Sequence, residues 1–332
     1  FLLRMYVLTL DPKYKYPVER CLDFVLESQY PIGGWPQRYP LHYEYVKGDK
    51  EDYTSFITIN DGVHTNNINF LLACYTLLGE TRALEPLQRA MTCVLALQGG
   101  KPQAGWAMQH KLDLNYSPGH ARGFDAATAT AEMCRNLMRF YRWTGDTKYL
   151  ARIPDAFEFL ESIRYNDAQM KQLGKSVKPG QILCPTFVEV GTNRPLYLHN
   201  DPDHYWVDYD YHGLITHYSS TRAIDLQSLK DEYQHLLSLS KEEVTKDSPF
   251  IGQTDISGTL LSHLMRGKMQ QADTQKVDSL LTILKKKDYL PGRLPSVSKE
   301  NPGFSNAPLP SEVISIKEYM NGMSTFIQYL TK

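Results

Sequence analysis

A helical pattern that occurs three times most constrains the fold of this chain. Segments that end at Gln29, Gln98 and Ile163 align without gaps over their last turns, at spacings of 69 and 65 residues. Apolar residues recur at helical intervals in each segment. A second apolar helix and a short polar turn precede each one, so the repeating unit is a pair of antiparallel helices followed by a long loop.

The turn inside each unit combines a residue that ends one helix with a residue that starts the next. The three turns are Leu10-Asp11-Pro12, Gly79-Glu80-Thr81 and Gly145-Asp146-Thr147. Glycine permits the left-handed conformation that often ends a helix, and Asp or Thr side chains cap the following N-terminus. One hairpin cannot bury both of its faces, so repeated hairpins are expected to stack.

These features predict a mainly α fold, namely an α/α toroid of stacked helical hairpins that forms a single domain over residues 1–332. The long loops that follow the second helices are expected to gather at one end and to carry the function. Residues 180–210 differ, because they alternate short apolar runs with turn residues and so predict a few short strands. Helical patterns resume near 223–240, 255–286 and 311–331, and the proline-rich stretch 291–310 predicts an extended surface segment.

Charge and hydropathy exclude some classes of partner. A net charge of -1 and a pI near 6.9 give no electrostatic case for nucleic acid or a membrane surface. No apolar run reaches the roughly 18 residues that a spanning helix needs. We therefore expect neither partner and a monomeric chain. Phe1 opens inside an apolar helical run, so the chain looks trimmed and a missing signal peptide does not argue against export.

The cysteines and histidines do not predict a metal centre. Cys21, Cys74, Cys93 and Cys134 lie in apolar helical runs and are expected to be core thiols. The five cysteines show no spacing typical of zinc sites, and their odd number argues against complete disulfide pairing. Three histidines cluster in sequence, but their spacing does not suit a metal site on a helix or a strand; they are His204, His212 and His217.

Two Gly-Trp turns follow the first two repeats and flank an Asn-Asp-Gly turn. The first runs from Gln29 through Gly34-Trp35-Pro36-Gln37, and the second from Gln98 through Gly105-Trp106 to Gln109-His110. Asn60-Asp61-Gly62 lies between them. Because stacked hairpins bring equivalent loops together, the three turns predict one cleft built from several loops.

These motifs, together with Ala121-Arg122-Gly123-Phe124-Asp125 and Gly191-Thr192-Asn193-Arg194-Pro195, resemble the catalytic module of family 10 pectate lyases. The resemblance runs from residue 1 to about 210. It implies a toroid that acts outside the cell, as a secreted, periplasmic or cell-surface protein. The implied activity is calcium-assisted β-elimination on polygalacturonate or a related acidic polysaccharide.

The reaction defines what such a site must hold. A base removes the C5 proton beside the uronate carboxylate, and positive charge on that carboxylate stabilises the anion that forms. Calcium prefers oxygen ligands. By resemblance, Asp61 is a calcium ligand and Arg194 is the catalytic residue, acting as base or carboxylate clamp. Asp113, two residues beyond the family's acidic position, is the expected second calcium ligand. The implied substrate-binding residues are Trp35, Gln37, Asn60, Trp106, Gln109, His110 and Arg122.

Structural roles compete with several of these assignments. Asp61 could cap a helix over residues 62–78, Arg122 could pair with Asp125, and Arg194 could brace its turn. The two Trp could serve only to build the Gly-Trp turns.

Two positions depart from the family pattern. Lys111 follows Gln-His where the family carries an acidic residue, and Glu189 precedes the Asn-Arg-Pro turn where our alignment expects an arginine. Three hypotheses therefore stay open: a lyase with a rearranged site, a protein that binds acidic polysaccharide without cleaving it, and a toroid glycoside hydrolase. The hydrolase would need two carboxylates, such as Asp61 with Asp125 or Glu189.

Overall fold

The computed structural model describes residues 1–41, 53–114, 123–200, 205–212, 219–251, 274–287, 291–292, 313–314, 321–322 and 325–326. The protein is mainly helical. Its helices are α1 (Leu2–Thr9), α2 (Pro12–Glu27), α3 (Val63–Leu78), α4 (Leu84–Ala96), α5 (Glu132–Thr144), α6 (Ile153–Ser162), α7 (Asp167–Gln172), α8 (Leu226–Ser238), α9 (Lys241–Thr245) and α11 (Thr274–Lys287). A π-helical turn, η3 (Ala126–Ala131), leads into α5.

The strands are short. They are β1 (Ile57–Thr58), β2 (Trp106–Ala107), β3 (Gln109–His110), β4 (Gly123–Asp125), β5 (Gln181–Pro185), β6 (Phe187–Glu189), β7 (Pro195–Asn200), β8 (Tyr205–Asp208), β9 (Thr221–Asp225), β10 (Pro291–Gly292) and β11 (Val313–Ile314). The strands predicted over 180–210 are confirmed, whereas β1–β4 and β9 were not predicted.

The three predicted hairpins are α1–α2, α3–α4 and α5–α6. Each first helix ends at a residue with positive φ, and the following acidic side chain accepts a hydrogen bond from the N–H two residues on. The pairs are Leu10–Asp11, Gly79–Glu80 and Gly145–Asp146. The capping prediction is thus confirmed for Asp11 and Asp146, whereas Glu80 takes the place of the predicted Asp or Thr in the second turn. Glu80 and Asp146 cap short 3-10 turns before α4 and α6, and a leucine with φ 53° takes the glycine position in the first turn.

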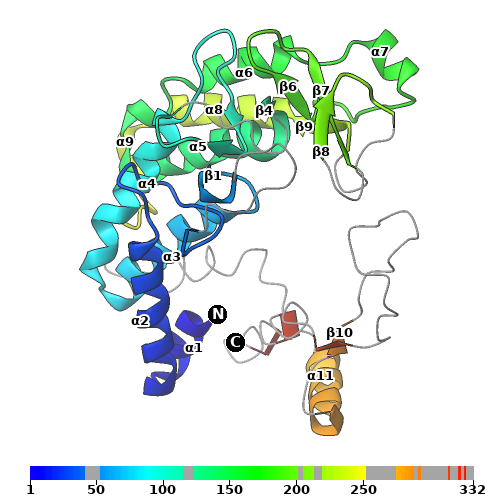
Figure 1. Ribbon diagram of the computed structural model, residues 1–332. Helices are drawn as coiled ribbons and strands as arrows, with labels where there is room; N and C mark the ends of the chain where they lie inside the picture. The colour runs from blue at the N-terminus through cyan, green and yellow to red at the C-terminus, as the bar shows by residue number, and fades with distance from the viewer. Residues whose placement is uncertain are drawn as a thin grey trace.

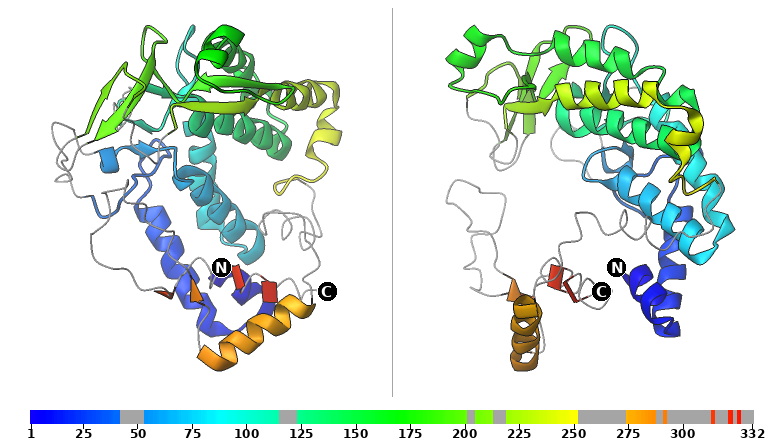
Figure 2. Two further views of the ribbon diagram at one scale, coloured as in Figure 1. Left: turned by 90° about the vertical axis from the view of Figure 1, so that its right-hand side faces the viewer. Right: turned by 180° about the vertical axis from the view of Figure 1, so that it is seen from behind.

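The hairpins follow one another in an arc from α1–α2 through α3–α4 to α5–α6 (Figures 1 and 2). Helix α8 lies beside α5 at one end of the arc, and the sheet of β4, β6, β7 and β8 lies beyond it (Figure 1). Among the described elements the arc does not close into a ring, so the toroid stays a prediction. The mainly helical class is confirmed.

The main apolar core runs through the helical hairpins, and a small separate cluster of Leu3, Val18 and Ala73 packs α1 and α2 on α3. The main core extends from Leu22 on α2 to Val244 on α9. The prediction of core thiols is confirmed for Cys74, Cys93 and Cys134, but it is wrong for Cys21, whose side chain is exposed on α2. A helical run places only one face inward, and Cys21 lies beside that face rather than on it.

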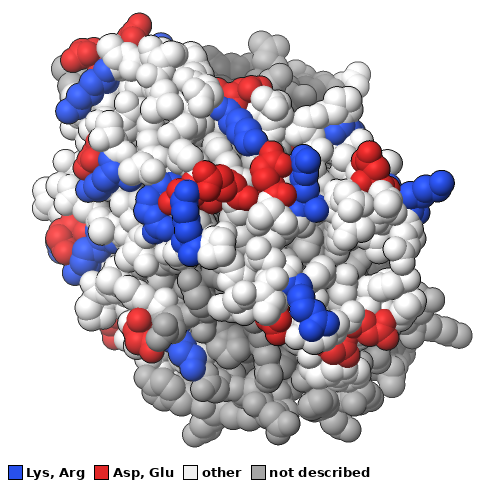
Figure 3. Space-filling view, turned by 90° about the horizontal axis from the view of Figure 1, so that it is seen from above, with Lys and Arg blue, Asp and Glu red and all other residues white. Residues whose placement is uncertain are grey.

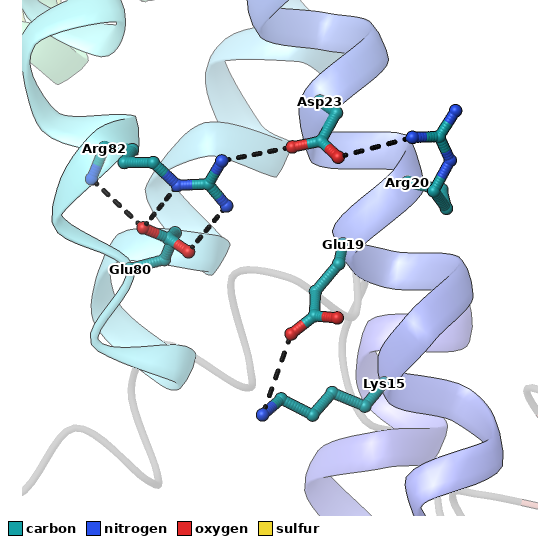
Figure 4. A network of polar contacts seen from close by, with 6 residues as sticks. All are labelled: Lys15, Glu19, Arg20, Asp23, Glu80 and Arg82. Carbon is teal, nitrogen blue, oxygen red and sulfur yellow. Dashed lines mark hydrogen bonds and ion pairs between the residues drawn. The ribbon is translucent and has the colours of Figure 1, made fainter.

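Charged side chains join the first two hairpins on the surface (Figure 4). The Arg82 guanidinium, in the turn between α3 and α4, lies 3.1 Å from Asp23 on α2 and 3.0 Å from Glu80. Arg20 extends the network to Asp23 at 3.7 Å. These groups are largely exposed, so each pair contributes little to stability, and the buried core carries the stacking.

The largest sheet has the strand order β2-β4-β6-β7-β8 with antiparallel neighbours, and β5 pairs separately with β9. The helical pattern predicted over 223–240 is confirmed as α8, preceded by β9. The described part of the helical pattern predicted over 255–286 lies in α11, whereas 255–273 and 293–310 lie outside the described residues. Within the part that is described, no helix has the length and apolar character needed to cross a bilayer.

Candidate functional site

The two Gly-Trp turns are built in the same way. The Trp35 indole N–H donates to the Val25 carbonyl at 2.9 Å, and the Trp106 indole N–H donates to the Val94 carbonyl at 2.9 Å. Both acceptors lie near the end of the preceding helix. Trp35 is 1% exposed and Trp106 is fully buried. This burial gives both indoles a structural role. The substrate-binding prediction required an exposed ring face that could contact a sugar, and neither indole has one.

The glutamines that end the first two repeats also have equivalent bonds. The Gln29 amide donates to the carbonyls of Gly33 and Pro86, and the Gln98 amide donates to those of Ala104 and Arg152, all within 3.1 Å. Each glutamine therefore fastens its own Gly-Trp turn to the start of the next repeat's second helix. The apolar Ile163 ends the third repeat and cannot make such bonds.

The glycine before each tryptophan is required by packing. A Cβ on Gly34 would lie 2.4 Å from a methyl carbon of Ile57, and one on Gly105 would lie 2.5 Å from the Phe159 ring. Both distances are far below van der Waals contact. The Gly-Trp pattern thus indicates a turn whose backbone packs directly against neighbouring side chains, where only glycine fits.

Three loops meet at one place in the fold. Strand β1 pairs with β3, with Thr58 opposite Gln109. The Thr58 N–H donates to the Trp35 carbonyl at 2.8 Å, and the Ile59 N–H donates to the Met108 carbonyl at 2.7 Å. The prediction that both Gly-Trp turns flank the Asn60-Asp61 loop is confirmed at the level of the backbone.

Four polar side chains form a chain of hydrogen bonds at this junction, which we call the Asp61 cluster: Gln37, Asn60, Asp61 and Gln109. The Gln109 amide donates to Asn60 Oδ1 at 2.8 Å, and the Asn60 amide donates to Asp61 Oδ2 at 3.1 Å. The Gln37 amide reaches the same Oδ2 at 3.2 Å. Asn60 and Gln109 are buried whereas Asp61 is exposed, so buried amides hold a surface carboxylate in place.

Asp61 does not cap helix α3. Gly62 is the N-cap residue, and no side chain accepts a bond at that helix start. Asp61 adopts a left-handed conformation with φ 57°, which is unfavourable for a residue with a side chain. The capping alternative is therefore wrong, and the strained backbone turns the carboxylate toward Gln37 and Asn60 instead.

Two buried histidines lie behind the cluster. Burial lowers the pKa of both His64 and His110 to about 4. His110 Nε2 accepts a hydrogen bond from the Ala107 N–H at 3.2 Å, which places the proton of the neutral ring on Nδ1. His64 Nε2 lies 3.0 Å from the Ala90 carbonyl, and its ring packs edge-on against Trp35. Both rings are therefore neutral core groups near pH 7, and His110 offers no surface to a substrate.

Arg194 lies in the turn between β6 and β7. Its guanidinium carbon is 3.5 Å from the centroid of the Tyr209 ring. The Glu189 carboxylate accepts hydrogen bonds from Thr192 at 2.5 Å and from Tyr209 at 2.6 Å. These two bonds, followed by the charge of Arg194, lower the pKa of Glu189. Glu189 is thus an ionised brace of its turn, and Arg194 stacks on the tyrosine that Glu189 holds.

The remaining predicted residues are less well placed. Lys111 and Asp113 lie in the turn after β3, where Lys111 Nζ is 5.9 Å from the Phe56 ring centroid and Asp113 is exposed. Arg122 lies outside the described residues, as do His204, His217 and the side chain of Asp125. His212 is described and pairs with Asp210 at 2.7 Å.

The Asp61 cluster can be compared with what calcium requires. Within the described ranges, no group of three His, Cys, Asp or Glu side chains is arranged to hold a metal. Calcium also accepts amide oxygens, and Gln37 Oε1 is buried without a hydrogen-bond partner in the part of the chain that the structure describes. The cluster thus provides one exposed carboxylate and one buried amide oxygen without a partner, which are two of the roughly six to eight oxygen ligands that calcium takes.

Sequence patterns did not reveal two residues near this region. Gln103 donates to the Glu189 carbonyl at 2.9 Å and to Asn193 Oδ1 at 2.6 Å, and accepts from the Gly191 N–H at 2.6 Å. It therefore ties the second Gly-Trp loop to the Arg194 turn. Trp206 on β8 is 37% exposed. No spacing or motif marks Gln103, whereas the aromatic run 205–211 could have identified Trp206.

Charge alone does not mark a substrate site on the face seen from above in Figure 3. Basic and acidic side chains are interspersed there and neither sign dominates. The hydrogen-bonded arrangement of side chains is therefore a better guide to a substrate site than the distribution of charge on this face.

Comparison with known families gives one match. The model of the pectic acid lyase family matches residues 1–216, which include the three hairpins, the Asp61 cluster and the Arg194 turn. A search of curated proteins finds no significant match.

Proposed function

The chain belongs to the pectic acid lyase family, and from this premise we propose that it cleaves a polygalacturonate-type polysaccharide by β-elimination. The observation that carries the proposal is the Asp61 cluster. Three loops separated in sequence meet there, where the Gln37 and Asn60 amides hold one exposed carboxylate and the buried Gln109 amide holds Asn60. A core does not need such an arrangement, whereas a site for a charged ligand does.

The reaction needs charge stabilisation more than covalent chemistry. A base takes the proton from C5 of the uronate, and the C5–H electron pair becomes the double bond between C4 and C5. The C4–O bond breaks, and the departing oxygen takes up a proton. Positive charge at the uronate carboxylate stabilises the anion that develops.

Asp61 is the proposed cation ligand. Gln37 Oε1 is a second oxygen in the same cluster, and Asp113 on the adjacent turn is the second proposed carboxylate. Bound calcium would supply positive charge to the uronate carboxylate. Asn60 and Gln109 act behind Asp61 as an oriented hydrogen-bond shell, of the kind that fixes metal ligands elsewhere.

Arg194 is proposed to clamp a uronate carboxylate. A guanidinium presents paired N–H donors that match a carboxylate. Its contact with the Tyr209 ring stabilises a cation, which supports the clamp and not the alternative role of base. Glu189, bonded to Thr192 and Tyr209, holds the platform on which the guanidinium rests.

The test follows the absorbance of the unsaturated uronate on polygalacturonate, with added calcium and with a chelator. We expect product formation that the chelator abolishes. Asp61→Asn should lower kcat/KM by about 100-fold, because the carboxylate is lost while the shape is kept. Asp167→Asn, an exposed aspartate in the first turn of α7, is the matched control and should retain full activity.

A second candidate function is binding of acidic polysaccharide without cleavage. Lys111 supports it, because a lysine follows Gln109-His110 where the resemblance predicts an acidic residue. Saturable binding of tetragalacturonate with no product at any calcium concentration would favour this candidate over the lyase. Cleavage that yields a product without a double bond would overturn both in favour of a hydrolase.

A further inference from the structure

The hairpin of β7 and β8 has two different faces. On one face, Leu196 packs with Met108 and Phe187 in a small core that Val207 also contacts. The register places Tyr197 opposite Asp208 and His199 opposite Trp206. Since side chains alternate along a strand, these four residues share the other face.

On that second face, Trp206 is fixed in orientation. Its indole N–H donates to Asp208 Oδ2 at 3.1 Å, and its ring stacks on the buried His199 ring with centroids 5.4 Å apart and planes 13° apart. Asp208 Oδ1 also lies 2.8 Å from His199 Nε2 and accepts from the Asp210 N–H at 2.8 Å. One carboxylate therefore holds the indole, the imidazole beneath it and the following turn.

A second exposed ring contacts Tyr197, which shares this face of the hairpin. Tyr211 is 43% exposed, and its ring packs against Tyr197 with centroids 6.4 Å apart. Exposed aromatic rings that hydrogen bonds and stacking hold in place are organised before any ligand arrives, which lowers the entropy cost of binding. The apolar C–H face of a pyranose ring is the complement of such a surface.

The charges around Trp206 indicate which sugar fits. Asp208 and Asp210 are 41% and 61% exposed, and their pairing partners in the described residues are histidines, His199 and His212. A uronate carboxylate on the indole would therefore meet like charge, which disfavours it. A neutral sugar would instead find carboxylate acceptors for its hydroxyl groups.

We propose that Trp206, assisted by Tyr211, is a binding site for a neutral pyranose ring, separate from the Asp61 cluster. The site goes beyond the proposed lyase activity and does not require it. It gives the chain a second contact with carbohydrate, selective for uncharged units where the Asp61 cluster is selective for uronates.

The protein's own fluorescence can test this site. Of its four tryptophans, Trp35, Trp106 and Trp143 are at most 9% exposed and Trp206 is 37% exposed. Titration with β-1,4-linked galactotetraose should give a saturable change in tryptophan emission. The matched titration uses tetragalacturonate, which has a carboxylate on every ring. Followed by calorimetry, its binding should be unaffected by Trp206→Ala.

Variants separate the outcomes. Trp206→Ala should weaken galactotetraose binding at least about 10-fold by calorimetry, and Tyr211→Ala about 3-fold. Trp206→Phe keeps a ring and should retain most of the affinity. Tyr16→Ala removes an aromatic that is 67% exposed on α2 and should change nothing. No saturable binding of galactotetraose, unchanged affinity in Trp206→Ala, or loss of tetragalacturonate binding in that variant would each overturn the proposal. Loss of lyase activity alone would not affect it.

Discussion

The Gly-Trp turns and the β7–β8 hairpin use tryptophan in opposite ways. Trp35 and Trp106 are buried, and their indole N–H groups bond to helix carbonyls. Trp206 is exposed, and its indole N–H bonds to a carboxylate side chain. A backbone acceptor inside the core makes an indole part of the scaffold, whereas the surface carboxylate that bonds to Trp206 holds an indole that is 37% exposed.

The same contrast distinguishes features that the repeats share from features that occur only once. Features that occur in two repeats, such as the paired glutamines and glycines, hold the hairpins together. Features that occur once, namely the Asp61 cluster, the Arg194 turn and Trp206, carry the charged or exposed groups that a ligand can reach. Similarity between the repeats therefore locates the scaffold, and we propose that the departures from it locate the site.

The sharpest way to break this comparison is to truncate the tryptophans in turn. Trp35→Ala and Trp106→Ala should each lower the free energy of unfolding by about 3–5 kcal/mol, since each leaves a large cavity and removes a buried hydrogen bond to a helix carbonyl. Trp206→Ala should lower it by less than about 1 kcal/mol. Urea unfolding followed by circular dichroism measures all three.

Trp35→Phe is the control that separates the loss of stability caused by lost side-chain volume from the loss caused by the missing hydrogen bond. It keeps most of the ring, so we expect a loss of only about 1–2 kcal/mol. If Trp206→Ala destabilised the fold as much as Trp106→Ala, the division between scaffold and ligand surface would be wrong.

Acidification should lower the free energy of unfolding through the two buried histidines. The pKa of His64 and of His110 is about 4 in the folded protein, against about 6.5 in an unfolded chain. The unfolded state thus binds more protons between these values, and stability present above pH 6.5 is lost as the pH falls toward 4. At pH 5 each histidine should lower the free energy of unfolding by about 2 kcal/mol relative to pH 7.

Urea unfolding at pH 7 and pH 5 measures this loss. His64→Gln should remove about half of the difference, and His235→Gln, which alters an exposed residue on α8, should leave it unchanged. Equal stabilities at the two pH values would show that the buried rings do not stay neutral.

Local sequence rules predicted the hairpins, because helix periodicity and capping act over a few residues. Gly79-Glu80 and Gly145-Asp146 were sufficient to place two of the turns. The same rules failed for Cys21 and for the capping role of Asp61. Whether a residue at the edge of a helix face is buried, and which conformation a loop backbone adopts, depend on the elements that pack against them. The Asp61 cluster depends on side-chain bonds between residues 24 and 49 positions apart, and the resemblance could name its members but not their bonds.

The smallest expected effect concerns Gln103, which joins the two regions. This side chain is only 8% exposed and bonds to the Glu189 carbonyl, to Asn193 and to the Gly191 N–H. Gln103→Ala should lower the free energy of unfolding by about 1–2 kcal/mol, because it removes the three hydrogen bonds that this buried side chain makes. It should also raise KM for polygalacturonate, since it loosens the turn that holds Arg194. Gln172→Ala, at an exposed position on α7, should change neither quantity. An unchanged KM alongside reduced stability would show that the turn is scaffold like the Gly-Trp loops, and that Arg194 does not clamp the substrate.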